Sequence, residues 1–124
     1  MDAEFPRPLT QEERSLLTFI LVKFCPGESQ FLEQLSQTVV TNECPCGCPT
    51  IDLWTEGAPA PPLRDARLLW RGTGRTAKNL LVTVSLLQTG GQLSSLDVAY
   101  FGDEVCADLP LPESIEEWPA ASKP

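Results

Sequence analysis

The sequence predicts an α+β protein: an N-terminal helical hairpin packed on one side of a small antiparallel β-meander. Apolar residues first recur with the period of a helix, and after Gln37 β-branched and alternating residues take over. Two later β-rich runs are separated by adjacent glycines, which is typical of a hairpin. A length of 124 residues fits one domain. We place it at residues 9–112, after an N-terminal arm at 1–8 and before an acidic, proline-punctuated C-terminal tail at 113–124.

The first helix is expected to begin at a capping box. The Thr10 hydroxyl can accept from the backbone N–H of Glu13, and the Glu13 carboxylate can accept from that of Thr10. A single buried stripe follows at helical spacing: Leu16, Leu17, Ile20, Leu21 and Phe24. A Pro-Gly pair ends this helix. A second helix is expected over residues 28–37, folded back on the first, with three apolar side chains facing inward: Phe31, Leu32 and Leu35.

Strands are expected from residue 38 onward. Residues 38–41 are β-branched throughout, and residues 50–55 alternate so that Ile51 and Leu53 share one face. The GAPAPP segment that follows is a loop, because its prolines cannot sustain a ladder. A hairpin then joins residues 79–87 to residues 93–101 through the turn Gln88-Thr89-Gly90-Gly91-Gln92.

A basic, glycine-containing segment precedes that hairpin. The run Arg71-Gly72-Thr73-Gly74-Arg75-Thr76 indicates a flexible loop that leads into the strand at residue 79. A phosphate-holding loop is the alternative, but the run lacks the rest of a dinucleotide fingerprint and the Gly-Lys-Ser/Thr of a P-loop. Beyond the hairpins, we expect the tail to dock through Ile115 and Trp118.

The composition excludes several classes of function. Seventeen acidic residues against nine basic ones give a net charge of −8, which disfavours nucleic-acid binding. Histidine is absent, so Ser-His-Asp catalysis, Cys-His catalysis and histidine metal ligation are excluded. No apolar run is long enough to span a membrane, and residues 1–8 lack the pattern of a secretory signal. We therefore expect a cytoplasmic protein whose five cysteines are reduced thiols or metal ligands.

Catalysis is not expected. Paired carboxylates are present, but nothing in the sequence places two of them in one cleft. Cys46 or Cys48 is a conceivable nucleophile, yet no base to activate either thiol is evident. We predict a non-enzymatic protein without a cofactor, with zinc or copper at the cysteines as the alternative.

The most unusual motif is C-P-C-G-C-P at residues 44–49, which contains Cys44, Cys46 and Cys48. Single-residue spacing with flanking prolines indicates a stiff turn rather than core packing. Thiolates bind Zn²⁺ or Cu(I) strongly. A fourth ligand is expected from one of four residues: Cys25, Cys106, Glu43 or Asp52. The spacing lacks the paired C-x₂-C knuckles of structural zinc sites, and a thiol–disulfide role or a purely structural turn stays open.

Four elements of the sequence stand out together: Leu9-Thr10-x-Glu12-Glu13-Arg14-x-Leu16-Leu17, Phe24-Cys25-Pro26-Gly27, Cys44-x-Cys46-Gly47-Cys48-Pro49-Thr50-Ile51 and Leu93-Ser94-x-Leu96-Asp97-Val98. With its capped helix, C-x-C-G-C-P turn and late strand, the chain resembles a family of small uncharacterised bacterial hypothetical proteins over residues 9–112. The resemblance implies a shared fold and a bacterial source, and it implies no particular activity.

Charge is unevenly distributed along the chain. Five basic residues and one acid lie between Arg64 and Lys78, whereas seven acids and no base lie between Asp97 and Trp118. A solvated surface is the simpler interpretation of the acidic stretch. The alternative, which we favour for function, is that the stretch attracts a basic protein partner.

The predicted function is therefore protein binding without catalysis. Its concrete form is a small acidic immunity-type inhibitor that covers the basic surface of a toxin or nuclease. The expected contact residues are Asp97, Asp103, Glu104 and Asp108 for ion pairs, with Trp54 or Trp118 as apolar anchors. A thiolate site at the cysteine turn and an accessory protein with no ligand are the two alternatives.

Overall fold

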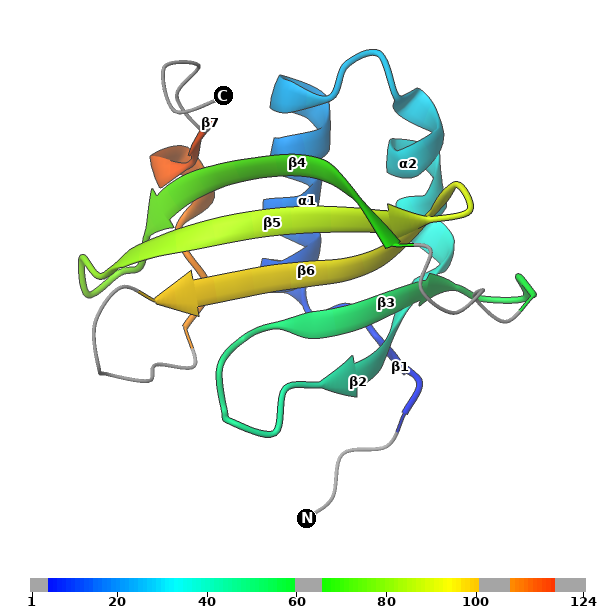
Figure 1. The fold of residues 1–124 in the computed structure, drawn as a ribbon, viewed down its shortest axis with the longest axis horizontal. Coiled ribbons are helices and arrows are strands. Elements are labelled where there is room, and N and C mark those ends of the chain that lie inside the picture. The colour runs from blue at the N-terminus through cyan, green and yellow to red at the C-terminus, as the bar shows by residue number, and fades with distance from the viewer. Residues whose placement is uncertain (1–4, 60–65, 101–107, 118–124) are drawn as a thin grey trace.

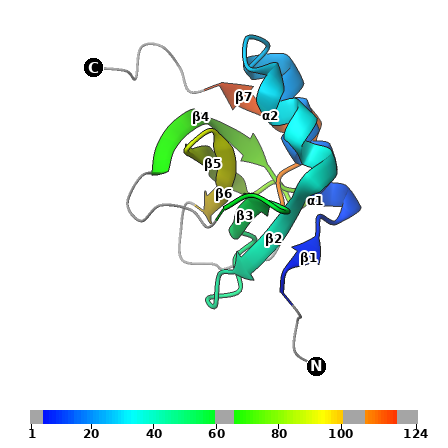
Figure 2. The ribbon, with the colours of Figure 1, turned by 90° about the vertical axis from the view of Figure 1, so that its right-hand side faces the viewer.

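An antiparallel sheet with helices on one of its faces makes up the fold, so the predicted α+β class is confirmed (Figure 1). The computed structural model describes residues 5–59, 66–100 and 108–117. Within these residues the sheet has seven strands, in the order β1-β2-β3-β6-β5-β4-β7. Seen from the side, the sheet curves and both helices lie on the same face of it (Figure 2).

Both predicted helices form, and the first is capped as expected. Helix α1 spans Gln11–Phe24; Thr10 Oγ1 accepts from Glu13 N at 3.1 Å, and a Glu13 carboxylate oxygen accepts from Thr10 N at 2.9 Å. Helix α2 spans Ser29–Gln34 and tightens into a 3₁₀ turn at Leu35–Gln37.

One prediction about the second helix is wrong. Phe31 and Leu35 are buried, as expected, but Leu32 is 37% exposed. A helix of this length buries a single face, and Phe31 and Leu35 share that face because they are four positions apart. Leu32, one position further on than Phe31, therefore points toward solvent.

The strands differ in length between the centre and the edges of the sheet. The two edge strands have two residues each: β1 at Arg7–Pro8 and β7 at Glu116–Glu117. The inner strands are β2 at Thr38–Glu43, β3 at Ile51–Thr55, β4 at Ala66–Arg75, β5 at Leu81–Thr89 and β6 at Gln92–Tyr100. The predicted hairpin joins β5 to β6, with Gly90 and Gly91 both at positive φ, as its tight turn requires.

Strand β4 replaces the loop that the sequence suggested, and this is the main error of the prediction. Residues 71–75 belong to a ten-residue strand that pairs with β5 from Ala66 to Arg75. The glycines have a packing role. A Cβ atom on Gly72 would lie 2.3 Å from the backbone oxygen of Glu116 and 2.4 Å from the Trp70 ring. The phosphate-loop alternative fails for the same reason, because this backbone is engaged in the sheet.

Both edges of the sheet come from the stretches predicted as an arm and a tail. In the predicted N-terminal arm, Arg7 pairs with Val40 of β2. In the predicted C-terminal tail, Glu117 pairs with Gly72 of β4. Ile115 is 3% exposed, which confirms that this stretch docks through it. Trp118, the second predicted anchor, lies outside the described residues.

The core lies between α1 and the sheet. The fully buried side chains of largest volume come from α1 and from the strands β2, β5 and β6: Leu16, Leu17, Ile20, Leu21, Val40, Val82, Val84, Leu86, Leu93 and Leu96. The predicted stripe of the first helix is therefore confirmed. Its last member, Phe24, is only partly buried and stacks on Trp70 at 5.0 Å between ring centroids.

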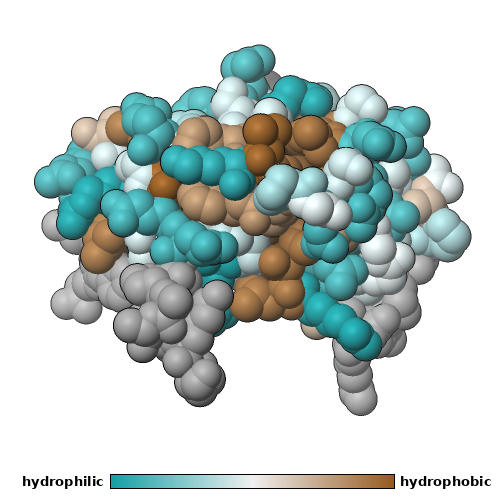
Figure 3. Space-filling view, turned by 90° about the horizontal axis from the view of Figure 1, so that it is seen from above, coloured by the Kyte–Doolittle hydropathy of each residue, from teal (hydrophilic) through white to brown (hydrophobic). Residues whose placement is uncertain are grey.

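The surface above β4 carries apolar side chains. Viewed from above Figure 1, hydrophobic surface gathers in the middle of the molecule (Figure 3). Val22 of α1 and Leu68 of β4 are 55% and 51% exposed. No helix in the described part of the chain is long and apolar enough to cross a membrane.

Candidate thiol site

The cysteine motif forms the turn between β2 and β3. Cys44 N donates to Thr50 O at 3.1 Å and closes the loop, and Gly47 N donates to Cys44 O at 3.2 Å within it. Gly47 has a φ of 93°, a conformation that favours glycine. The stiff turn predicted from the prolines and the glycine is therefore the structure that forms.

Thr50 fastens this turn to the centre of the sheet. Its hydroxyl accepts from Val98 N at 2.9 Å and donates to Val98 O at 3.2 Å. Val98 belongs to β6, the strand that pairs with β3. The turn is thus held at both the β2–β3 hairpin and the neighbouring strand, which restricts the positions of its thiols.

The turn brings its three thiols together. The sulfur atoms of Cys44, Cys46 and Cys48 all lie within 4.8 Å of one another. The shortest approach is 2.9 Å, between Cys44 Sγ and Cys46 Sγ, and Cys48 N donates to Cys46 Sγ at 3.4 Å. Cys46 is exposed and the other two are half-buried. Soft metal ions can therefore reach the cluster from solvent.

The proposed fourth ligands do not join this cluster within the described residues. Cys25 is buried at the end of α1. Glu43 is engaged with Arg7, and Asp52 lies on β3 facing solvent. Cys106 lies outside the described residues.

Cys44 and Cys48 differ in pKa. Burial raises the pKa of Cys48, but hydrogen bonds from Cys46 and Thr50 outweigh burial and lower this pKa to about 7. The pKa of Cys44 rises to about 11, chiefly through its hydrogen bond to Cys46, with the negative charge of Cys48 contributing in the same direction. Cys48 therefore ionises before Cys44, which holds its proton.

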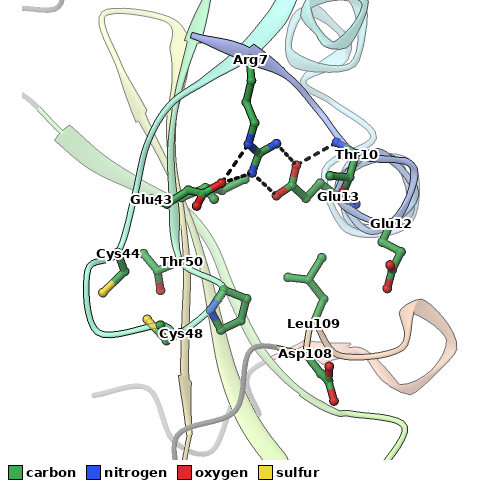
Figure 4. Close-up of a pocket in the computed structure, with 13 residues that line it drawn as sticks. Arg7, Thr10, Glu12, Glu13, Glu43, Cys44, Cys48, Thr50, Asp108 and Leu109 are labelled. Atoms are coloured by element: carbon green, nitrogen blue, oxygen red, sulfur yellow. Dashed lines mark hydrogen bonds and ion pairs between the residues drawn. The ribbon is translucent and has the colours of Figure 1, made fainter. Parts of the chain in front are cut away.

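A pocket of about 320 Å³ opens beside the thiols (Figure 4). Cys44, Cys48 and Thr50 lie on one side of it, and Glu12 and Asp108 lie on the other. Its lining combines thiols with four carboxylates, from Glu12, Glu13, Glu43 and Asp108, and one guanidinium, from Arg7. The thiol turn and the start of α1 thus face a common space.

Arg7 joins the walls of this pocket. Its guanidinium donates to both carboxylate oxygens of Glu13 at 3.0 Å and, through Nε, to Glu43 at 2.9 Å. Burial opposes ionisation of Glu13, but the hydrogen bonds from Arg7 and from the Thr10 backbone outweigh it and lower the pKa of Glu13. The same carboxylate thus caps α1 and binds the β1 strand.

The residues predicted to contact a partner lie in separate hollows. Asp108 lines the pocket beside the thiols, whereas Asp97 shares a shallow depression on the sheet with Arg71. Trp54 lines a third hollow, and its Nε1 donates to Pro59 O at 2.8 Å. Asp103, Glu104 and Trp118 lie outside the described residues.

Sequence reasoning missed the role of Arg7. The Arg7–Glu43 contact joins residues 36 positions apart, so no local pattern reveals it. The one available signal was the capping glutamate Glu13, whose buried charge requires a partner.

Comparisons with protein-family models, with curated proteins and with solved structures find no match to the chain. The resemblance to a family of small bacterial proteins therefore stays a prediction.

Proposed function

We propose that Cys44, Cys46 and Cys48 bind a single soft metal ion, and that this ion is Cu(I). The observation that carries the proposal is the convergence of the three sulfur atoms within 4.8 Å on a turn fastened to the sheet. Thiolate sulfur is the ligand type that selects Cu(I), zinc and iron–sulfur clusters. A site of this kind makes the protein a metal-binding module rather than an enzyme.

The number of ligands favours Cu(I) over zinc. Structural zinc is almost always bound by four protein ligands in a tetrahedron, and the group found among the described residues contains three. Three thiolates alone make a soft, sulfur-only ligand set, which suits Cu(I). Zinc would need a fourth ligand from outside this group of three.

Metal binding at this site must compete with protons. Cys48 is already partly a thiolate near neutrality, with a pKa of about 7, whereas Cys44, with a pKa of about 11, releases its proton when the metal binds. The apparent affinity for Cu(I) should therefore fall as pH falls through 7. It should keep rising above pH 7, because Cys44 becomes easier to deprotonate.

The test is an anaerobic titration of the reduced protein with Cu(I) in competition with a chromogenic Cu(I) chelator. We expect one Cu(I) per chain. Each of C44S, C46S and C48S should weaken Cu(I) binding by about 100-fold or more, because changing a residue that only contacts a ligand already costs roughly 10–100-fold in metal affinity. Cys25→Ala is the matched control, since it removes a thiol outside the turn. Equal loss in this control, or unchanged affinity in the three serine variants, would contradict the proposal.

A thiol–disulfide role is the second candidate, favoured by the 2.9 Å approach of Cys44 Sγ to Cys46 Sγ. Its signature is a bridge between these two residues after mild oxidation, found by mass spectrometry of peptides, with no preference for Cu(I) over zinc. The immunity-type inhibitor stays a prediction. Asp97, Asp108 and Trp54 line three different hollows.

A further inference from the structure

We infer that the pocket beside the thiols admits a positively charged thiol, and that this thiol receives the metal ion. The natural partner would be a protein whose cysteine lies next to lysine or arginine. This inference rests on the proposed Cu(I) site and adds the class of molecule that exchanges metal with it.

The position of the pocket supports an incoming ligand. Cys44 and Cys48 line it together with residues from the start of α1 and from the segment before β7. Three thiolates leave an open side on the bound ion, and a fourth sulfur can approach it from the pocket. A volume of about 320 Å³ is enough for a side chain and lies at the lower end of small-molecule pockets.

The charges of the pocket select the ligand. Its four carboxylates face a single guanidinium, and Arg7 is already bonded to Glu13 and Glu43. Asp108 has Lys78 at 3.9 Å, but both side chains are largely exposed, so solvent screens that pair. Even with Lys78 counted beside Asp108, four carboxylates outnumber the cations, so the pocket is negative in sum, and Glu12 and Asp108 lie on its side opposite the thiols (Figure 4). A cationic group is attracted there, and an anionic thiol is repelled.

The exchange is a ligand substitution in which copper stays Cu(I). The incoming thiol loses its proton and forms a new Cu–S bond. One Cu–S bond to a cysteine of the turn breaks, and that cysteine takes up the released proton. Repetition of the step with further thiols moves the ion off the protein, and no electron is transferred.

The experiment measures the loss of Cu(I) from the loaded protein to three small thiols of similar size: cysteamine, which is cationic, 2-mercaptoethanol, which is neutral, and 3-mercaptopropionate, which is anionic. Each is used at the same thiolate concentration and low ionic strength. We expect cysteamine to remove the metal about tenfold faster than 3-mercaptopropionate, with the neutral thiol between them, and added salt to narrow the difference.

The variant Glu12→Gln/Asp108→Asn should reduce that tenfold preference to about twofold or less. Glu33→Gln/Glu56→Gln is the matched control, because it removes the same charge from exposed residues outside the pocket. Loading of each variant is checked first, by its Cu(I) stoichiometry.

The outcomes separate the two proposals. If Cu(I) loads but the three thiols remove it at equal rates, the inference about the ligand is wrong and the metal site stands. If the control lowers the preference as much as the pocket variant, the effect is one of net charge and the pocket has no role. If Cu(I) does not load, the proposed function fails, and the inference fails with it.

Discussion

Arg7 connects two carboxylates of the pocket wall, those of Glu13 and Glu43. It donates to Glu13 and Glu43 from a side chain that is 21% exposed, and the Glu13 side chain is 8% exposed. Removing one partner of a largely buried pair leaves the other charge without compensation. The stability of the pocket therefore depends on a contact between the edge strand β1 and the start of α1.

We predict that Arg7→Met lowers the free energy of unfolding by about 2–3 kcal/mol at pH 7, less than the loss of a fully buried pair. The pKa of Glu13 is lowered in the folded protein, so its stabilisation is fully present above the unfolded pKa near 4.5. This stabilisation is lost as the pH falls toward and through the lowered pKa that Glu13 has in the folded protein. The difference between wild type and variant should thus shrink markedly at pH 3.

Urea unfolding at pH 7 and pH 3 measures both differences. Arg67→Met is a suitable control, because Arg67 is exposed on β4, and its effect should stay within about 0.5 kcal/mol. A difference for Arg7→Met that is the same at both pH values would show that packing, rather than the ion pair, accounts for the loss.

At the scale of the elements, strand β4 leaves no room for a side chain at Gly72. A side chain on Gly72 would collide with the backbone of β7 and with Trp70, whereas one on Gly27 would meet nothing within 4 Å. We predict that Gly72→Ala destabilises the protein by about 1–3 kcal/mol and displaces β7. Gly27→Ala, the matched control, should change stability by about 0.5 kcal/mol or less.

The displacement of β7 can be measured by limited digestion with a protease that cuts after glutamate. Glu116 and Glu117 form β7, so Gly72→Ala should expose them to early cleavage. If cleavage at these two residues is as slow as in Gly27→Ala, β7 does not depend on the bare backbone of Gly72.

The elements that the sequence predicts are those whose signals are local. The capping box at Thr10, the apolar stripe after it and the glycine pair at Gly90 are each complete within one segment. Strand β4 was missed because Gly72 and Gly74 resemble loop residues. Glycine is required at these positions because β7 and Ile115, more than forty positions away in the sequence, pack closely against them. The pocket was missed similarly, since Arg7 meets Glu43 across 36 positions.

The candidate site, too, was predicted from the sequence only where its signal is local. The three cysteines could be named from their motif, and the turn places their sulfur atoms together because all three lie within five residues. The low pKa of Cys48 depends in part on Thr50, and the charge across the pocket depends on Arg7 and Asp108. These residues come from separate parts of the chain. These long-range neighbours decide what can approach the thiols.

At the scale of the whole molecule, the net charge of −8 opposes folding through repulsion among the acids. We predict that 0.5 M NaCl raises the midpoint of thermal unfolding by about 2–4 °C over a low-salt buffer, because salt screens exposed charges more than the buried Arg7 pair. A triple variant, D52N with E33Q and E56Q, carries three fewer charges and should respond less. An equal response would show that the effect of salt comes from preferential exclusion rather than from screening.

Among the described residues, both borders of the sheet are closed by strands of two residues, and the two strands come from opposite ends of the described chain. Short borders limit joining between molecules, since a long unpaired strand is a template for aggregation. The second closure, β7, is translated after the other described strands. A nascent chain that has reached β6 but not Ile115 would have a complete β4 with its outer side open. Premature termination in that interval would yield products prone to self-association, because the outer side of β4 would be unpaired.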